Sequence, residues 1–425
     1  VHKFGGSCLR DGNDIDQIAE IIRSSEGRPI IVVSALWGMT DRLIRASREP
    51  RYASRLVQDL IYQHLRFAPG LDTGEFGELF NRVISGISKE LLKFSSGEES
   101  MRSENLILAA GERLSALAVA HRLRKSGIED AHPVGAEDIG LRLKGIGRAN
   151  KIDIEASSVN LDRHELIGVP ILTGWFGEGD DGNIALLTRG GSDHSAAAFA
   201  RLMNASKLIL WKDVDGIKQL NPRWGIETPS ISYLGYGQAA ELSMHGTPVI
   251  HPATVYPLIE EGIPIEIKNF HNRNSPVSTI IGPDIETDEI IAIGCQPGVA
   301  IITDNKPLSS DLLLEIERLG IIPWLMKSTP DGFKIILPKP PTSIKLTNYS
   351  KICKRGIDRK SFGRIKTQFV DEINCPLTLI PFYGRPSPNS INQLITFLFL
   401  TKSLKRQKSH NQGYQNFFLK HESVI

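Results

Sequence analysis

The chain has 425 residues, enough for two or three domains, and 41% of them are hydrophobic and 23% charged. This composition excludes a disordered or collagen-like chain, and no apolar run approaches the ~18 residues that span a bilayer. Lys+Arg of 50 against Asp+Glu of 48 gives a net charge of +2, too balanced for nucleic acid to be the main partner. The first residues lack the apolar stretch of a secretory signal, and the four cysteines form no CxxC pair. We therefore expect a soluble, cytoplasmic protein with no membrane or nucleic-acid partner, no disulfide framework and no zinc site.

The first 280 or so residues alternate helix-like and strand-like segments, the pattern of an α/β protein. Isoleucines at 15, 18, 21 and 22 recur at helical spacing, and the β-branched run 30–33 is typical of a parallel strand covered on both faces. The segment 48–104 is helical in character and is expected to form a cap or an insertion. Further elements are expected in chain order: a helix over 106–118, a strand over 169–173, a helix over 195–202 and a strand over 208–211.

A polar break from Gly282 to Glu289 predicts a domain boundary. A small β-α-β-β unit is expected beyond it, with strands over 290–293, 299–302, 321–326 and 333–337 and an amphipathic helix over 308–319. A vaguer unit follows, with a strand over 377–382, and then a basic stretch without periodicity that indicates a solvated tail. We therefore expect four regions: 1–284, 285–342, 343–400 and 401–425.

The sharpest local feature is the opening Lys3-Phe4-Gly5-Gly6-Ser7, directly before a helix start. Two adjacent glycines let the backbone approach a ligand, and their N–H groups beside a lysine ammonium can form a cradle for phosphate. A tight turn that happens to contain two glycines is the alternative interpretation.

A second pair of glycines opens a helix in Thr188-Arg189-Gly190-Gly191-Ser192-Asp193. Arg189 offers two-pronged recognition of a carboxylate or phosphate, whereas Asp193 is placed where a carboxylate can also cap the helix. A Ser-His-Asp triad is excluded, because adjacent residues cannot converge on one point and no GxSxG sequence is present.

Two further motifs carry candidate site residues. The strand over 208–211 ends in Lys212-Asp213, and the following loop reaches Arg223, which suits one edge of a nucleotide but also a plain hairpin. Gly111-Glu112-Arg113 heads the apolar stripe of a long helix. The Glu112 carboxylate is therefore either a ligand for a substrate amine or the internal partner of Arg113.

Several familiar signatures are absent or weak. The chain holds no Walker A sequence and no protein-kinase motif. A GxGxxG match at Gly177, Gly179 and Gly182 precedes a strand pattern and carries two aspartates that repel a pyrophosphate, so it predicts a hairpin turn. His245 and His251 are spaced wrongly for one helix face, so we expect no metal site.

In this order, the motifs closely resemble the aspartate kinase pattern within the amino acid kinase family. The resemblance spans about residues 1–282 and rests on the segments Lys3–Ser7, Val33–Ala35 with Gly38 and Thr40, Gly111–Arg113, Arg189–Asp193, Lys212–Gly216 with Pro222-Arg223, and Gly246–Ala253. It implies an α/β fold of the amino acid kinase type, a mostly parallel sheet sandwiched by helices. The C-terminal β-α-β-β unit over 285–342 resembles the regulatory ACT domains that usually follow, and 343–400 would be a second, degenerate one.

The resemblance implies ATP-dependent phosphorylation of the side-chain carboxylate of L-aspartate, giving 4-phospho-L-aspartate on the pathway to lysine, threonine and methionine. A carboxylate with a pKa near ~4 is already ionised at pH 7, so no general base is required. The protein must supply positioning and charge neutralisation, with Mg²⁺ bound mainly through the nucleotide.

The resemblance also implies the site residues. Lys3 and Asp193 are the expected catalytic pair, Arg189 would hold the substrate α-carboxylate, and Glu112 would meet its ammonium group. The phosphate and ATP site would comprise Lys3, Gly5, Gly6, Ser7, Lys212, Asp213 and Arg223, and the substrate site Ser34, Thr40, Glu112, Arg189, Ser192 and Asp193.

The chain departs from the family pattern at the nucleotide contacts. The usual KFGGTS reads KFGGSC here, and Lys212 and Lys218 stand where threonine and tyrosine are frequent. Pro248 replaces a common lysine, and proline offers neither a charge nor a backbone N–H to a phosphate. We hypothesise that Lys212 supplies the missing charge. An exposed, solvated lysine is the alternative.

Two other functions are compatible with these residues. One is another amino acid kinase, acting on glutamate, acetylglutamate, carbamate or UMP, although Arg189 with Glu112 favours a free amino acid. The other is a catalytically weak amino-acid-sensing protein, which the intact Lys3, Arg189 and Asp193 oppose. Lysine or threonine is the expected effector, and a homo-oligomer is expected because ACT-like sheets pair.

Overall fold

The computed structural model describes most of the first 285 residues and short segments after them. The described residues are 1–96, 100–149, 151–188, 190–219, 222, 228–244, 249–272, 279–285, 292–294, 300–304, 307–310, 312–313, 325–337, 351–353 and 377–379. The chain divides into two compact units, the first made of 1–219, 229–292 and 375–377, and the second of 220–228, 293–374 and 378–425.

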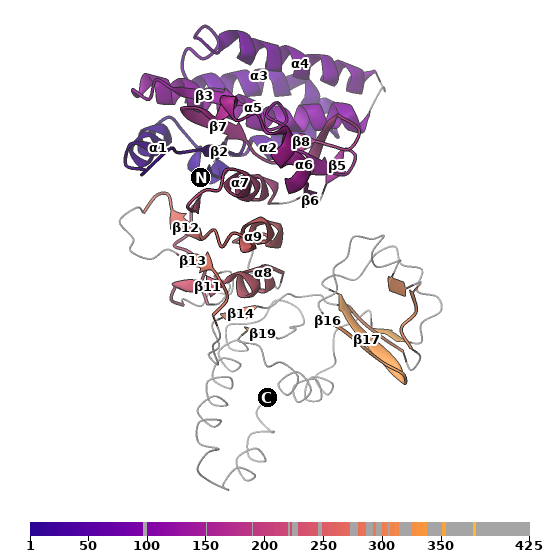
Figure 1. The fold of residues 1–425 in the computed structure, drawn as a ribbon. Helices are drawn as coiled ribbons and strands as arrows, with labels where there is room; N and C mark the ends of the chain where they lie inside the picture. Colours follow the sequence, from indigo (N-terminus) through magenta and orange to yellow (C-terminus); the bar gives the residue numbers. More distant parts are fainter. Residues whose placement is uncertain are drawn as a thin grey trace. The chain divides into compact units, whose positions relative to one another are not determined.

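An eight-stranded sheet runs through the first unit in the order β11-β13-β12-β10-β1-β2-β7-β3 (Figure 1). Its strands are β1 His2–Phe4, β2 Ile31–Val33, β3 Ala131–Val134, β7 Val169–Thr173, β10 Leu208–Lys212, β11 Tyr233–Gly235, β12 Ile265–Asn269 and β13 Thr279–Gly282. Every pairing from β12 to β3 is parallel, whereas β13 runs antiparallel to β12. The predicted α/β fold with a mostly parallel sheet is confirmed.

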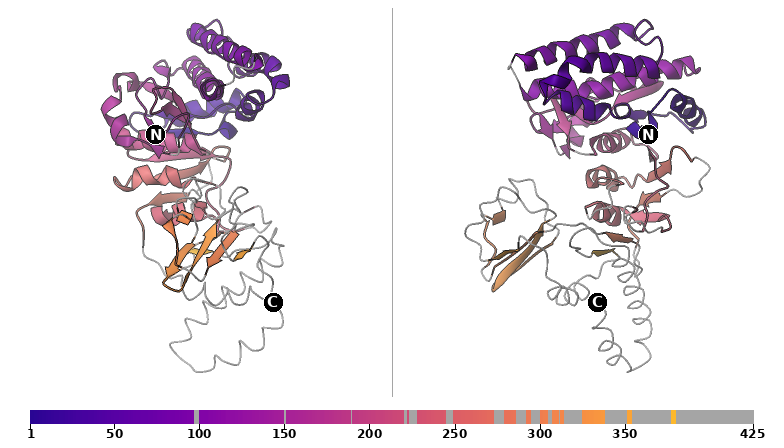
Figure 2. Two further views of the ribbon diagram at one scale, coloured as in Figure 1. Left: turned by 90° about the vertical axis from the view of Figure 1, so that its right-hand side faces the viewer. Right: turned by 180° about the vertical axis from the view of Figure 1, so that it is seen from behind.

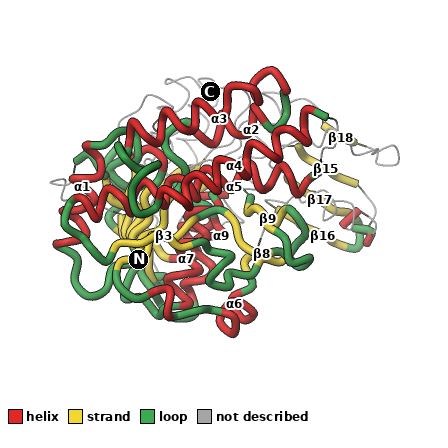
Figure 3. Tube along the Cα trace, turned by 90° about the horizontal axis from the view of Figure 1, so that it is seen from above, coloured by secondary structure: helices red, strands yellow, loops and turns green. Residues whose placement is uncertain are grey.

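Helices cover both faces of this sheet (Figures 2 and 3). The described helices are α1 Asn13–Arg23, α2 Met39–Ala46, α3 Pro50–Phe67, α4 Gly77–Ser95, α5 Met101–Lys125, α6 Ile154–Asn160, α7 Gly191–Leu202, α8 Tyr236–Met244 and α9 Pro252–Ile259, with 3-10 turns η1 Gly6–Cys8 and η2 His164–Leu166. In Figure 3, α3, α4 and α5 lie on one side of the strands, and α6 and α7 lie on the other. None of the described helices combines the length and apolarity needed to cross a bilayer.

The alternation of side chains along the central strands builds two separate cores. Phe4 and Trp211 face the side of α1 and α5, with parallel rings whose centroids lie 6.0 Å apart. Val32 and Leu210 face the other side, where they join the buried residues Ala196, Ala197, Ala198 and Ala200 of α7. Small side chains on α7 let this helix lie close to β1, β2 and β10.

The predicted helical segment 48–104 is an integral layer of the first core. Its helices α3 and α4 bury Leu56, Leu60 and Phe80 against α5, itself buried along most of its length. The helical character of this segment is confirmed, and its packing into the first core contradicts a separate cap, whereas an insertion stays a prediction.

Smaller strands lie between α5 and α7. They are β4 Leu143–Lys144, β5 Arg148–Ala149, β6 Lys151–Ile152, β8 Phe176–Glu178 and β9 Ile184–Leu187. Strands β8 and β9 pair antiparallel, so the GxGxxG match at 177–182 lies in a hairpin, as predicted.

The second unit contains an antiparallel sheet in the order β16-β17-β15-β18. Its strands are β15 Ala300–Asp304, β16 Leu325–Thr329, β17 Gly332–Leu337 and β18 Lys351–Cys353, and the chain also forms the short strands β14 Ala292–Gly294 and β19 Leu377–Leu379. Strand β18 comes from beyond the expected boundary at 342 and pairs with β15. Most of the helix expected over 308–319, the start of the strand expected at 321 and the whole tail 401–425 lie outside the described residues.

His64 on α3 is completely buried, and burial lowers its pKa to about 4. Its ring lies 2.7 Å (Nδ1) from the Leu60 carbonyl oxygen, and its Nε2 has no hydrogen-bond partner in the structure. The unfolded chain takes up a proton here below pH ~6.5, but the folded chain does so only near the lowered pKa. The contribution of neutral His64 to stability is therefore complete above pH ~6.5 and is lost as the pH falls toward 4.

We predict that the free energy of unfolding falls less in His64→Leu than in the wild type when the pH is lowered from 7 to 5. The difference between the two proteins should be about 2 kcal/mol. Urea denaturation at the two pH values measures this difference. His164→Leu, at an exposed histidine, is the matched control and should keep the wild-type slope. An unchanged slope in His64→Leu would contradict the prediction.

Candidate active site

Neighbouring strand ends bring the first glycine motif to the carboxyl edge of the sheet. The turn after β1 packs closely on the loop after β2. A Cβ added at Gly6 would lie 3.0 Å from the Ala35 carbonyl oxygen. The Ser34 N–H donates a hydrogen bond of 3.2 Å to the Phe4 carbonyl oxygen. The predicted residues Gly5, Gly6, Ser7 and Ser34 therefore lie on adjacent loops, and only glycine fits at position 6 without displacing the backbone.

Lys3 is directed toward α7 by its place in the sheet. It lies opposite Val32 and Leu210 in the strand register and so shares the face of the second core. Its side chain is 8% exposed, and Nζ lies 2.7 Å from Oδ1 of Asp193 in the first turn of α7. The predicted pair of Lys3 and Asp193 is brought together.

Lys212 binds the other oxygen of the same carboxylate. It follows Leu210 by two residues at the end of β10, so it occupies the same face of the sheet as Lys3. Its Nζ lies 2.7 Å from Oδ2 of Asp193, and its side chain is 19% exposed. The interpretation of Lys212 as an exposed, solvated lysine is therefore wrong.

The two ammonium groups keep Asp193 ionised. Burial alone would raise the pKa of this carboxyl, but the charges of Lys212 and Lys3 together hold it well below its ordinary value. The N-cap of α7 is Gly190, which has a left-handed φ of +84°, and no side chain caps this helix. Asp193 is thus a shared partner of two lysines rather than a helix cap, and the three side chains together carry one net positive charge.

Glu112 lies in α5 and is 2% exposed. It accepts a hydrogen bond from the backbone of Ala35, but its Oε2 has no partner in the structure. Burial raises the pKa of this carboxyl to about 8. Arg113 donates from Nε to Glu137 over 3.1 Å, so the alternative interpretation of Glu112 as the partner of Arg113 is wrong.

The remaining predicted residues are placed as follows. Thr40 lies in the first turn of α2, after Gly38 with its φ of +74°, and Ser192 lies in the first turn of α7. Asp213 is half exposed and faces Arg10 at 3.6 Å. Arg189, Arg223 and Pro248 lie outside the described residues.

The sequence analysis did not single out the loop after β7 as part of the site. A Cβ at Gly174 would lie 2.7 Å from Cβ of Ser192, and Trp175 has a left-handed φ of +69°. The Trp175 N–H donates to the Ser195 hydroxyl of α7 over 3.1 Å. A Gly-Trp pair directly after a predicted parallel strand was the available signal, since ligands of such sheets bind at the carboxyl ends of the strands.

His251 supports the second glycine motif from α9. Its Nδ1 accepts a hydrogen bond of 3.2 Å from the Ala253 N–H and caps the helix. A Cβ at Gly190 would lie 2.8 Å from Cβ of His251, so the turn before α7 packs directly on this residue. The His-Pro pair is a recognisable helix start, but nothing in the sequence indicates its contact with Gly190.

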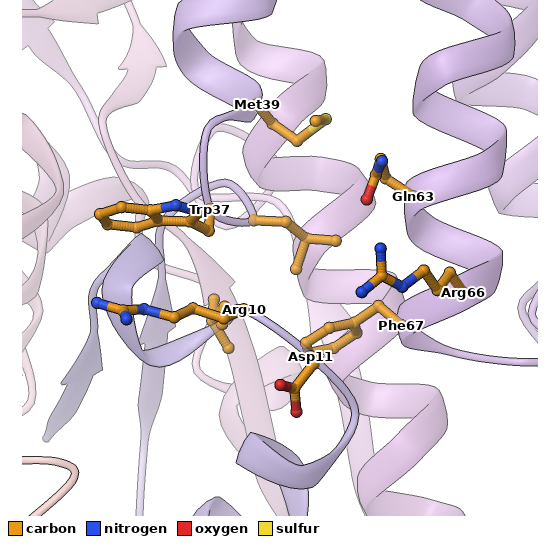
Figure 4. A pocket seen from close by; sticks show the side chains of 9 residues that line it. Arg10, Asp11, Trp37, Met39, Gln63, Arg66 and Phe67 are labelled. Atoms are coloured by element: carbon orange, nitrogen blue, oxygen red, sulfur yellow. The ribbon is translucent and has the colours of Figure 1, made fainter.

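Two further features bear on what the site can hold. The described residues contain no group of three or more His, Cys, Asp or Glu side chains arranged for a metal ion. A small cavity near Arg10, Trp37 and Arg66 lies beyond the 3-10 turn and is not lined by Lys3, Asp193 or Lys212 (Figure 4). Its volume of about 30 Å³ leaves room for about two water molecules, so it is not a pocket for an amino acid.

The chain is similar to known proteins over much of its length. Residues 1–269 match the model of the amino acid kinase family. The chain is 31% identical to the bifunctional aspartokinase/homoserine dehydrogenase 2 of Arabidopsis thaliana, over 72% of this chain and 35% of that protein. It is 28% identical to aspartokinase 3 of Bacillus subtilis, over 72% of this chain and 69% of that protein.

A solved structure shares the fold. Aspartokinase III of Escherichia coli, in complex with aspartate and ADP, matches with a TM-score of 0.69 at 22% identity, covering 81% of each chain. The chain spans about a third of the length of the bifunctional plant relatives. Because the family model covers more than half of the residues, the chain belongs to the amino acid kinase family.

Proposed function

We propose that this chain phosphorylates the side-chain carboxylate of L-aspartate with ATP, giving 4-phospho-L-aspartate for the pathway to lysine, threonine and methionine. The observation that carries the proposal is the array of Lys3, Asp193 and Lys212 beside two glycine turns. Relatives that match two thirds or more of this chain are named aspartokinases, which supports aspartate as the substrate.

The array suits the transfer of a phosphoryl group. The substrate carboxylate is ionised at neutral pH, so the protein needs no general base and must instead hold the reactants in line and neutralise charge. Lys3 and Lys212 would meet the phosphoryl oxygens together with backbone N–H groups of Gly5, Gly6 and Ser7. Asp193 would position both ammonium groups.

The amino acid would be held beside this array. Following the family resemblance, Arg189 would bind its α-carboxylate and Glu112 its ammonium group, with Ser34, Thr40 and Ser192 lining the same site. Asp213 and Arg223 would contact the nucleotide. Mg²⁺ would offset charge on the ATP phosphates, and it would be carried mainly by the nucleotide, since the described residues offer no ligand cluster of their own.

A hydroxamate assay with L-aspartate and MgATP tests the proposal, because hydroxylamine traps an acyl phosphate directly. Parallel reactions with glutamate, acetylglutamate, carbamate and UMP separate aspartate from the substrates of other members of the family. Product formed with one of these and not with aspartate would assign another substrate. No product from any of them would favour a sensing protein.

We predict that Lys3→Met lowers turnover on the order of 10²–10³-fold, since it removes one charge from the transition state. Folding should survive, because Lys212 still pairs with Asp193. Steady-state kinetics and circular dichroism measure the two effects. Turnover within a few-fold of the wild type would remove Lys3 from the catalytic machinery.

Lys212→Thr should weaken the use of ATP by about ten-fold or more, equivalent to ~1.4 kcal/mol for one charge-assisted contact. Adding Pro248→Lys should restore much of the loss if Lys212 supplies the charge that proline cannot. Lys207→Thr is the matched control, because Lys207 precedes the same strand and pairs with Glu266 instead. An unchanged ATP KM and turnover in Lys212→Thr would refute the compensation.

We also propose that 285–342 and 343–400 are ACT-like regulatory units, which bind lysine or threonine and pair between copies to form a homo-oligomer. The antiparallel sheet of β15 to β18 supports a small α+β unit in this region. Deletion from Ile290 onward should abolish inhibition by either amino acid, as measured by initial rates with 4-phospho-L-aspartate as product. Inhibition that survives in a folded truncated protein would place the effector site elsewhere.

A further inference from the structure

Glu112 occupies an unusual position for a carboxyl group. It is buried on α5 where Gly111 brings the helix so close that a Cβ there would lie 2.7 Å from Leu43 and 3.0 Å from Ala35. One of its oxygens lacks any hydrogen-bond partner in the structure. Ser115, one turn along the same helix, is also completely buried with an unpartnered hydroxyl. Unsatisfied buried polar atoms of this kind are costly and call for a polar ligand.

Among the described residues, none serves as a counter-ion for Glu112. Lys3 on β1 exerts a field on it, but the Lys3 ammonium is already engaged by Asp193 of α7. On α5 itself, Arg113 is turned to Glu137. An isolated carboxylate in such a place is unfavourable, so burial keeps this group protonated at neutral pH.

The other described elements packed against α5 do not change the preference of Glu112 for its protonated form. Strands β2, β7 and β9 carry no titratable side chain. Charged and titratable residues of the neighbouring helices and of β3 are exposed or engaged. Asp41, Arg42 and Arg45 on α2 are exposed, and His64 on α3 is held neutral by burial. His132 on β3 lies against the Asp130 and Glu165 carbonyl oxygens.

We infer that binding of the substrate ammonium is coupled to release of the Glu112 proton. The Glu112 carboxylic acid loses its O–H proton to solvent, and the resulting carboxylate pairs with the R–NH₃⁺ group of the incoming amino acid, so charge is conserved. The inference rests on the proposed function and adds that Glu112 releases a proton when L-aspartate binds. The site is thereby kept free of a buried bare anion until the amine arrives.

The coupling makes the affinity for L-aspartate depend on pH. Burial raises the pKa of Glu112 to about 8, and an adjacent substrate ammonium would lower it. Below this pKa, binding must expel a proton, so the apparent Kd should rise about ten-fold for each pH unit of acidification. Above it, the dependence on pH should flatten. A ligand without an ammonium group has no such requirement.

Isothermal titration calorimetry at pH 7 tests the coupling. L-aspartate is titrated into the full chain with Mg²⁺ and a non-hydrolysable ATP analogue, in buffers of different ionisation enthalpy. The slope of the observed enthalpy against buffer ionisation enthalpy gives the protons released. We expect close to one proton per L-aspartate bound and none for succinate, which has the same two carboxylates without the ammonium.

Two variants test whether Glu112 is the source of the released proton. Glu112→Gln keeps the shape of the neutral acid and should abolish the proton release and flatten the pH dependence of the Kd. Glu137→Gln is the matched control, because burial also raises the pKa of Glu137, yet this carboxyl pairs with Arg113. It should leave the proton release unchanged.

The outcomes separate the inference from the proposed function. L-aspartate that binds without proton release, or with equal release in Glu112→Gln, would overturn the coupling and leave the kinase proposal standing. Failure of L-aspartate to bind at all would overturn the proposed function and the coupling with it. If Glu112→Gln binds too weakly for calorimetry, the difference between L-aspartate and succinate in the wild-type protein decides.

Discussion

The carboxylate of Asp193, shared by two lysines, is the interaction on which the rest of the site depends. One oxygen binds Lys3 and the other binds Lys212, each at 2.7 Å. Burying a carboxylate without partners would cost several kcal/mol, and the two flanking cations keep Asp193 ionised despite its burial. The site is left with one positive charge at the N-terminus of α7, where the helix dipole adds to the positive potential. Under the proposed function, this positive charge would be in place to stabilise a phosphoryl group during transfer.

Close approach of backbone segments makes this convergence possible. Gly6 lies against Ala35, Gly174 against Ser192, and Gly190 against His251, in each case at a distance that leaves no room for a Cβ. The alanines of α7 have the same effect on the helix as a whole, because they let it settle onto β1 and β10. Small residues at the carboxyl edge of the sheet therefore allow the two lysines and the aspartate to lie within contact distance.

The two buried carboxyl groups of the site have opposite charge states for one physical reason. Asp193 has two ammonium partners and stays ionised, whereas Glu112 has only backbone donors among the described residues and is held neutral by burial. The first arrangement presents positive charge to a phosphate. Under the proposed function, the second would form a carboxylate when the substrate ammonium binds, so the phosphoryl side and the amine side of the site would differ in charge.

The sequence by itself determined the parallel strands, the long helix α5 and the hairpin at 177–182, because hydrophobic periodicity and turn residues are local properties. The alternation of side chains along a strand also puts Lys212 on the same face of the sheet as Leu210. Only the tertiary structure decided which charges meet. The order of the strands places β1 beside β10, and the packing of α7 brings Asp193 to both lysines. Lys212, which the local pattern left open between solvent and site, is therefore partly buried and paired with Asp193. For the same reason, the sequence did not predict that Arg113 pairs with Glu137, or that Glu112 has no counter-ion among the described residues. Pairing between residues far apart in the chain depends on distances that no local pattern encodes.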